Sequence, residues 1–164
     1  MAESDNNKAL AGRLTRISPL VWRLTAPNAG VMTGPGTNTY IVGSKKVAII
    51  DPGPEDSEHL SNIVKMLDDN GLQVSWIMPT HTHMDHSPMA VALMEAAGGM
   101  MAGKRAPNIV TQDQTFIPGL NLEHGDQVKG EDFTLETIHT PGHASNHLCF
   151  LLKEEQLLFT GDHI

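Results

Sequence analysis

Short apolar runs of β-type composition are spread along the chain and predict strands. The first covers residues 19–26, and two more, at 39–42 and 47–50, are separated by the polar segment Gly-Ser-Lys-Lys. Two β-rich runs joined by such a short segment are typical of a β-hairpin. A fourth run, at 74–78, is expected to form a buried strand.

Residues 55–70 have apolar side chains at helical spacing and predict an amphipathic helix. Its apolar positions are Leu60, Ile63, Val64 and Leu67. Acidic residues in the first turn and Gly71 after the last turn suit the two ends of a helix. His59 lies on the flank of this helix and is expected to be solvated.

A second helix is expected at 89–97, which is nearly all apolar. Ser87 is expected to cap it, with Pro88 at the first helical position. Beyond residue 100 the pattern becomes strand-like, at 100–102, 133–138, 147–152 and 156–160. Strands and helices alternate early and strands dominate later, which favours an α+β fold, a mixed sheet with helices on an outer face.

The composition is that of one folded domain. The chain has 164 residues, of which 40% are hydrophobic and 18% charged, so it is neither a disordered polyampholyte nor a membrane protein. This length suits a single domain with a sizeable core. Residues 1–18 are expected to form a loose leader and residues 19–164 the domain.

Charge, cysteine content and hydropathy limit the kinds of partner, cross-link and cellular location that the protein can have. A net charge of −8, with only two Trp, one Tyr and four Phe, disfavours nucleic acid as a partner without excluding a nuclease. Cys149 is the single cysteine, so an internal disulfide is ruled out. No secretory start is present, and no apolar stretch approaches the roughly 18 residues of a membrane helix, so a cytoplasmic protein without membrane contact is expected.

Side chains that bind metals are concentrated in Thr-His-Thr-His-Met-Asp-His at 80–86. On an extended loop leaving a strand, His81 and His83 share a side because side chains alternate. Asp85 and His86 follow where the chain turns into the next helix. Such a segment can give two imidazoles to one cation, and a carboxylate and an imidazole to a second.

Two further segments carry the same chemistry, His-Thr-Pro-Gly-His at 139–143 and Gly-Asp-His at 161–163. Each follows an apolar β-run, so His143 and Asp162 can converge with the first segment at one rim of a sheet. Asp51, at the end of the run 47–50, is a candidate for orienting a ligating imidazole, with a turn cap as the alternative.

These three segments, taken in order, resemble the signature of the metallo-β-lactamase superfamily. Gly-Thr-Asn-Thr-Tyr at 36–40 and Ile-Ile-Asp-Pro-Gly at 49–53 resemble its opening hairpin and first motif. The similarity runs from about Val21 to the end of the chain. It is greatest to the glyoxalase-II-like branch and to the β-lactamase-like-2 hydrolases, some of which cleave RNA.

The resemblance implies an αβ/βα sandwich with a two-metal site between its sheets. His81, His83 and His143 would bind the first metal, Asp85 and His86 the second, and Asp162 would bridge both. Asp85 would also exchange a proton during catalysis. Three neutral imidazoles leave an open position on zinc, as a hydrolytic site needs, so zinc is expected, with manganese or iron as alternatives.

The function implied is hydrolysis of a small ester, thioester, amide or phosphodiester by a metal-bound hydroxide. The first alternative is a mononuclear-iron persulfide dioxygenase, whose two histidines and aspartate would match His81, His143 and Asp162. The second is an inactive metal-binding fragment. Histidine at position 83 favours zinc over an oxygen-reactive diiron pair, because flavodiiron oxygen reductases have glutamate there.

The chain departs from the family after Asp162, because the family's sandwich continues with further strands and helices that supply another histidine to the second metal. The chain ends at Ile164 and is therefore expected to supply mainly the N-terminal half of the sandwich. The second metal site would lack a ligand and could stay empty. An apolar sheet face would be exposed, which predicts a homodimer through that face.

Overall fold

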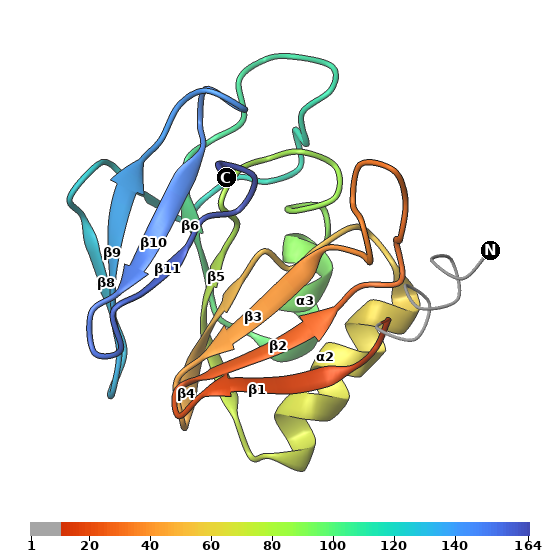
Figure 1. Cartoon of the computed structure of the whole chain (residues 1–164), viewed down its shortest axis with the longest axis vertical. Helices are drawn as coiled ribbons and strands as arrows, with labels where there is room; N and C mark the ends of the chain where they lie inside the picture. The colour runs from red at the N-terminus through yellow and green to blue at the C-terminus, as the bar shows by residue number, and fades with distance from the viewer. Residues whose placement is uncertain (1–10) are drawn as a thin grey trace.

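The computed structural model describes residues 11–164, which form two β-sheets and two helices (Figure 1). The larger sheet has seven strands in the order β1-β2-β3-β4-β5-β6-β7. Their bounds are β1 Leu14–Ser18, β2 Val21–Thr25, β3 Asn38–Val42, β4 Lys46–Ile50, β5 Gln73–Met78, β6 Met100–Gly103 and β7 Leu120–Asn121. Strands β1 to β4 pair antiparallel, and β4 to β7 pair parallel.

The smaller sheet is an antiparallel meander in the order β11-β10-β9-β8. Its strands are β8 Gln127–Lys129, β9 Thr134–His139, β10 Leu148–Leu152 and β11 Leu157–Phe159. The helices α2 (Ser57–Asp69) and α3 (Met89–Ala97) connect β4 to β5 and β5 to β6. Parallel neighbours need such crossover connections, whereas antiparallel neighbours need only turns.

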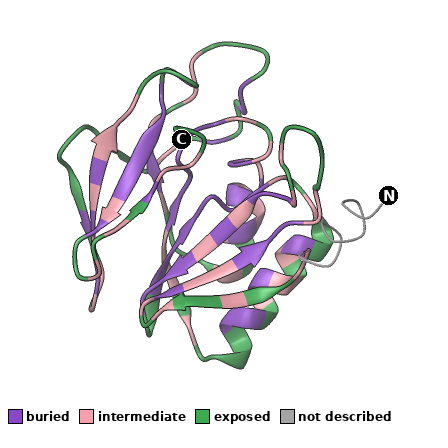
Figure 2. Cartoon of the chain, in the orientation of Figure 1, coloured by how far each residue is buried: buried purple, intermediate pink, exposed green. Residues whose placement is uncertain are grey.

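The larger sheet forms the middle of three layers, with α2 and α3 on one face and the smaller sheet on the other (Figure 1). Side chains alternate between the two faces along each strand. Ile41 and Ile49 pack against the helices, whereas Val42 and Ile50 pack against the smaller sheet. Figure 2 shows the matching pattern on α2, which is buried on one side and exposed on the other.

Most of the predicted elements are present, and the α+β class is confirmed. The hairpin at 39–50 is β3 and β4, with Tyr40 opposite Ile50 and Val42 opposite Ala48. The first predicted helix is α2, whose N-cap is Asp56 and which is followed by Gly71 in a left-handed conformation. The predicted strand at 74–78 is β5.

The prediction that residues 1–18 form a loose leader is wrong for residues 14–18, which form β1. Leu14 pairs with Leu24 and Arg16 with Trp22, and the Arg16 guanidinium lies 4.4 Å from the centre of the Trp22 ring. Backbone pairing and this cation–π contact hold a segment whose side chains are mostly exposed. Residues 1–10 of the predicted leader lie outside the described part of the chain.

The predicted serine cap of α3 is also wrong. The N-cap of α3 is Pro88, and it makes no side-chain capping bond. The Ser87 hydroxyl instead donates to Oδ2 of the buried Asp113, 2.7 Å away. A buried carboxylate without hydrogen-bond donors is costly, so the Ser87 hydroxyl is used there. The N-terminus of α3 finds a backbone acceptor instead, since the N–H of Met89 donates to the oxygen of Gly53.

His59 is fully buried, against the prediction that it is solvated. It lies four residues before Ile63 and therefore on the face of α2 that packs on the sheet. Its Nε2 is 2.9 Å from Oγ1 of Thr39, which in turn donates to the backbone oxygen of Asp51. Burial lowers the pKa of His59 to about 4.

The outer face of the smaller sheet carries Ile138, Leu151 and Leu158, of which Leu158 is 46% exposed. The homodimer through this face stays a prediction. Within residues 11–164, no helix has the length and apolar character needed to span a membrane.

The buried His59 predicts that acid destabilises the protein. Its pKa is about 4 in the folded chain and 6.5 in the unfolded chain. Between these pH values the unfolded chain therefore binds a proton that the folded chain does not. Stability contributed by the neutral ring is complete above about pH 6.5 and is lost as the pH falls toward 4. From pH 7.5 to pH 5 the loss should be about 2 kcal/mol of unfolding free energy.

Urea denaturation at the two pH values, with a chelator present, measures this loss. His59→Gln keeps a polar group near Thr39 but does not titrate, so its unfolding free energy should fall by about 2 kcal/mol less than that of the unchanged protein. His124→Gln, at an exposed position, is the matched control and should behave as the unchanged protein. Equal pH dependence in all three proteins would contradict the assignment.

Candidate metal centre

The predicted site residues gather at one edge of the sandwich. Strands β4 and β5 run parallel, so Asp51 after β4 and the segment 80–86 after β5 leave the larger sheet at the same edge. Strands β9 and β11 both pair antiparallel with β10, so the residues that follow them also leave the smaller sheet together. The backbone N–H of Leu148 donates to the oxygen of Thr80 at 2.7 Å and joins the two edges.

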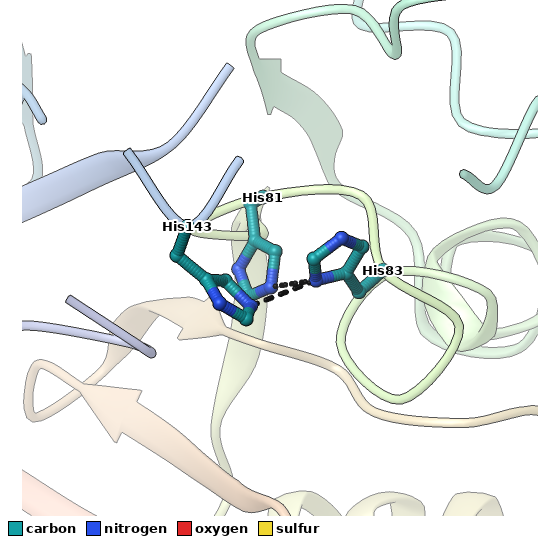
Figure 3. A group of neighbouring side chains, drawn as sticks. All are labelled: His81, His83 and His143. Carbon is teal, nitrogen blue, oxygen red and sulfur yellow. Dashed lines mark hydrogen bonds between the residues drawn. The ribbon is translucent and has the colours of Figure 1, made fainter. Parts of the chain in front are cut away.

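Three histidine nitrogens converge at this edge (Figure 3). Nδ1 of His83 lies 3.0 Å from Nε2 of His81 and 2.9 Å from Nε2 of His143. A tetrahedral zinc ion with ordinary Zn–N bonds separates its ligand nitrogens by roughly 3.3 Å. These two distances are within a few tenths of an ångström of that spacing, and the donor atoms of all three histidines lie within 4.8 Å of one another.

A buried hydrogen-bond chain orients His81. The Asp51 carboxylate accepts from the Thr80 backbone N–H at 2.6 Å and from the Thr80 hydroxyl at 3.0 Å. The single hydroxyl proton goes to Asp51, so Oγ1 of Thr80 accepts from Nδ1 of His81, 3.0 Å away. The neutral ring then carries its lone pair on Nε2, the atom that faces His83. Burial, followed by the positive charges that His86 and His147 can carry, lowers the pKa of His81 to about 2, which keeps the ring neutral.

A second group surrounds His86. Its Nε2 lies 3.2 Å from Oδ1 of Asp162 and 3.4 Å from Oδ2 of Asp85, and its Nδ1 lies 3.1 Å from Oδ2 of Asp51. Burial lowers the pKa of this imidazole, but the three carboxylates outweigh burial and raise it to about 12. This corner of the site therefore favours a positive charge, either a proton on His86 or a cation in its place.

Asp162 stands between the two groups. Its Oδ1 faces His86, while its Oδ2 lies 3.3 Å from Nε2 of His143 and 3.9 Å from Nε2 of His81. The hydrogen bond from His86, with the charges of the neighbouring histidines, holds the pKa of Asp162 well below its usual range. Two carboxylate oxygens that face different imidazoles suit a bridging position.

Within residues 11–164, two overlapping sets of donor atoms lie close enough together to hold a metal ion. They are His81, His83 and His143, and His81, His86 and Asp162, with the donor atoms of each set within 4.8 Å of one another. Asp85 belongs to neither set, but its Oδ2 lies 3.4 Å from Nε2 of His86, which is a member of the second set. The chemistry of both sets fits divalent cations such as zinc, and the roles of the individual residues as ligands stay predictions.

His147 contributes to the site, although the sequence pattern indicates only a turn or strand residue. It is fully buried, its Nε2 accepts from the backbone N–H of Asp162 at 3.2 Å, and its Nδ1 contacts Oγ1 of Thr140 at 2.9 Å. Gly161 makes this approach possible, because a Cβ at that position would lie 2.8 Å from Nε2 of His147. Residue spacing in the sequence indicates neither the contacts of His147 nor the need for glycine at position 161.

A cavity of about 330 Å³ opens beside the second group. Asp51, Asp85, His86 and Asp162 line its polar end. The loop before β3 contributes Met32, Thr33, Gly36 and Thr37, and the inner faces of both sheets contribute Val21, Tyr40 and Phe159. The cavity thus joins the carboxylates to an apolar wall, a combination that suits a small organic substrate.

The chain belongs to the metallo-beta-lactamase superfamily, whose family model matches residues 32–164. Its fold is the αβ/βα sandwich of that superfamily. A beta-lactamase domain protein from Burkholderia ambifaria superimposes with a TM-score of 0.74 at 18% identity, over 91% of this chain and 56% of the other. ETHE1 from Myxococcus xanthus superimposes with a TM-score of 0.62 at 25% identity, over 76% of this chain and 51% of the other.

Curated relatives are more similar in sequence. An atrochrysone carboxyl ACP thioesterase from Cryptosporiopsis sp. is 36% identical over 91% of this chain and 45% of its own length. A thioesterase from Emericella nidulans is 35% identical over 90% of this chain and 42% of its own length. The chain therefore spans a little under half the length of these relatives.

Replacing Gly161 by alanine should damage the site. The glycine has a φ of +50°, and a Cβ there would lie 2.5 Å from Oγ1 of Thr80, so both backbone strain and a buried clash result. We expect a loss of about 2 kcal/mol of unfolding free energy in urea denaturation. Gly142→Ala is the matched control, because no atom lies within 4 Å of its Cβ position. Equal effects of the two substitutions would contradict this packing.

The converging imidazoles predict a zinc site that depends on His83. Zinc titrated into the metal-free protein should raise its melting temperature, and His83→Ala should abolish most of the shift because only two of the three nitrogens remain. Calorimetric titration should show the same loss as weaker binding. His124→Ala, at an exposed histidine outside both donor sets, is the control and should bind zinc as the unchanged protein does.

Proposed function

We propose that this chain is a metal-dependent hydrolase that acts on thioesters. The observation that carries the proposal is the convergence of three imidazole nitrogens next to a carboxylate whose two oxygens face different histidines. Thioesterase names among the curated relatives favour the thioester over the ester, amide and phosphodiester that the same chemistry could cleave.

In this proposal His81, His83 and His143 would hold one divalent cation, most simply zinc. Asp85 and His86 would hold a second, and Asp162 would contribute to both. Cations bound there would lower the pKa of water and polarise the carbonyl oxygen of the substrate.

The other residues orient and exchange protons. Asp51 fixes the tautomer of His81 through Thr80 and stands beside His86. The Asp85 carboxylate is partly exposed at the cavity and is placed to exchange a proton with the substrate side of the site. Hydrogen bonding from His86 lowers the pKa of Asp85, so it is ionised and able to accept that proton near neutral pH.

A mononuclear-iron persulfide dioxygenase is the second candidate, and the likeness to ETHE1 supports it. Its ligand set would be His81, His143 and Asp162, in which Oδ2 of Asp162 lies 3.9 Å from Nε2 of His81 and 3.3 Å from Nε2 of His143. His83 favours the hydrolase, because its Nδ1 stands within 3.0 Å of both ligand histidines and completes a three-imidazole set. Iron alone in the purified protein, with oxygen uptake on glutathione persulfide, would replace the hydrolase by the dioxygenase.

The zinc-loaded protein should release thiol from acyl thioesters of N-acetylcysteamine or coenzyme A, as measured with a colorimetric thiol reagent. His81→Ala and His143→Ala should reduce the rate to that of the buffer, since each removes a nitrogen from the first donor set. His124→Ala should retain the rate, and circular dichroism checks that each variant is folded. Zinc binding without turnover of thioester, ester, amide or phosphodiester would leave an inactive metal-binding protein and contradict the hydrolase.

A further inference from the structure

Thr82 lies between the two histidines of the first donor set and is fully buried. Its hydroxyl donates to Oε1 of Gln112 at 2.7 Å and accepts from Nδ2 of Asn146 at 2.8 Å. Gln112 and Asn146 are themselves 7% and 3% exposed, so water competes little for these bonds. None of these three residues is among the groups that could hold a metal ion.

The direction of these bonds is fixed by the surroundings of Asn146. Its amide nitrogen also faces the backbone oxygen of Lys104 at 3.2 Å, and a carbonyl can only accept. The Asn146 side chain therefore presents its N–H groups to both Lys104 and Thr82. The single proton of the Thr82 hydroxyl must then go to Gln112. Asn146 therefore donates to Thr82, and Thr82 donates to Gln112.

Backbone contacts reinforce the side-chain bonds. Gln112 forms an isolated antiparallel bridge with His83, and the N–H of Asp113 donates to the oxygen of Thr82 at 2.7 Å. Asp113 is held in turn by the hydroxyl of Ser87, at 2.7 Å. The loop that follows β6 is thereby pinned against the histidine segment that follows β5.

Asn146 connects this assembly to the other sheet. It lies three residues after His143, in the connection between β9 and β10, whereas Thr82 follows β5. The bond between Thr82 and Asn146 therefore ties the loop that carries two of the converging nitrogens to the loop that carries the third. These loops leave different sheets, whose edges are joined by the backbone bond from Leu148 to Thr80. The bond between Thr82 and Asn146 adds a second tie, made from the residue between His81 and His83.

We propose that Thr82, through its hydrogen bonds to Asn146 and Gln112, is a positioning residue that sets the distance of His81 and His83 from His143. This inference rests on the proposed metal centre, because its consequence is a preformed three-imidazole site. Loss of groups that orient metal ligands typically weakens metal binding about 10- to 100-fold. The hydroxyl of Thr82 touches no ring nitrogen, so its effect acts only through the two loops.

Thr82→Val tests the proposal, since it keeps the shape of the side chain and removes both hydrogen bonds. Zinc affinity, measured by competition with a chromophoric chelator, should fall about 10- to 100-fold. Thr82→Ser restores the hydroxyl and should bind within about threefold of the unchanged protein. Cobalt(II) substituted for zinc should give a weaker and shifted visible absorption band in Thr82→Val, because the ligand geometry is less regular.

A control separates positioning from general loss of stability. Ile63→Val removes one buried methyl group from α2, away from both loops, and costs about 1 kcal/mol. It should leave zinc affinity and the cobalt spectrum unchanged. Gln112→Met removes the acceptor of the Thr82 proton and supplies a second variant, which should weaken zinc binding in the same direction as Thr82→Val.

Three results would overturn the proposal: unchanged zinc affinity in Thr82→Val and Gln112→Met, a loss no larger than in Ile63→Val, or failure of serine to restore binding. Absence of zinc and cobalt binding by the unchanged protein would instead overturn the metal centre itself, and the positioning role with it.

Discussion

The site depends on the buried carboxylate of Asp51. Asp51 directly follows β4, and its backbone has the left-handed conformation that aspartate tolerates better than most residues. The residue is 3% exposed. It accepts two hydrogen bonds from Thr80 and lies 3.1 Å from His86. One carboxylate thereby fixes the start of the histidine segment, the tautomer of His81 and the charge of His86. An apolar residue at position 51 would leave buried donors without acceptors.

Charge at this edge is balanced over two neighbouring regions. Around His81, burial and then the charges that the neighbouring imidazoles can carry lower the pKa of His81 and of His83, which favours the neutral form of these two rings. Around His86 three carboxylates outnumber one imidazole, and positive charge is favoured. Asp162 lies at the boundary, with one oxygen in each region. The protein thus holds together a set of groups that repel one another in part, and a cation relieves that repulsion.

Much of the fold and the ligand candidates could be predicted from the sequence, because both depend on local patterns. Short apolar runs of β-type composition predicted β3, β4 and β5, and helical spacing predicted α2. The histidine motifs follow strand ends that the topology brings together. Long-range partners could not be predicted. Thr82, Asn146 and His147 act through residues 15 to 64 positions away. The burial of His59 was available from its four-residue offset to Ile63, whereas β1 is held by pairing that its exposed side chains do not indicate.

The donor atoms come from both sheets, His81 and His83 from the larger and His143 and Asp162 from the smaller. Elsewhere the two sheets meet mainly through apolar side chains, which resist separation but oppose sliding only weakly, since dispersion and the hydrophobic effect have little directionality. A few polar contacts, such as the hydrogen bond from the Leu20 N–H to Glu155, add direction away from the site. Directional bonds to a shared cation would fix the two sheets relative to each other at one end of this interface and would resist sliding between the layers. Metal occupancy would then govern the mechanical rigidity of the sandwich as well as its chemistry.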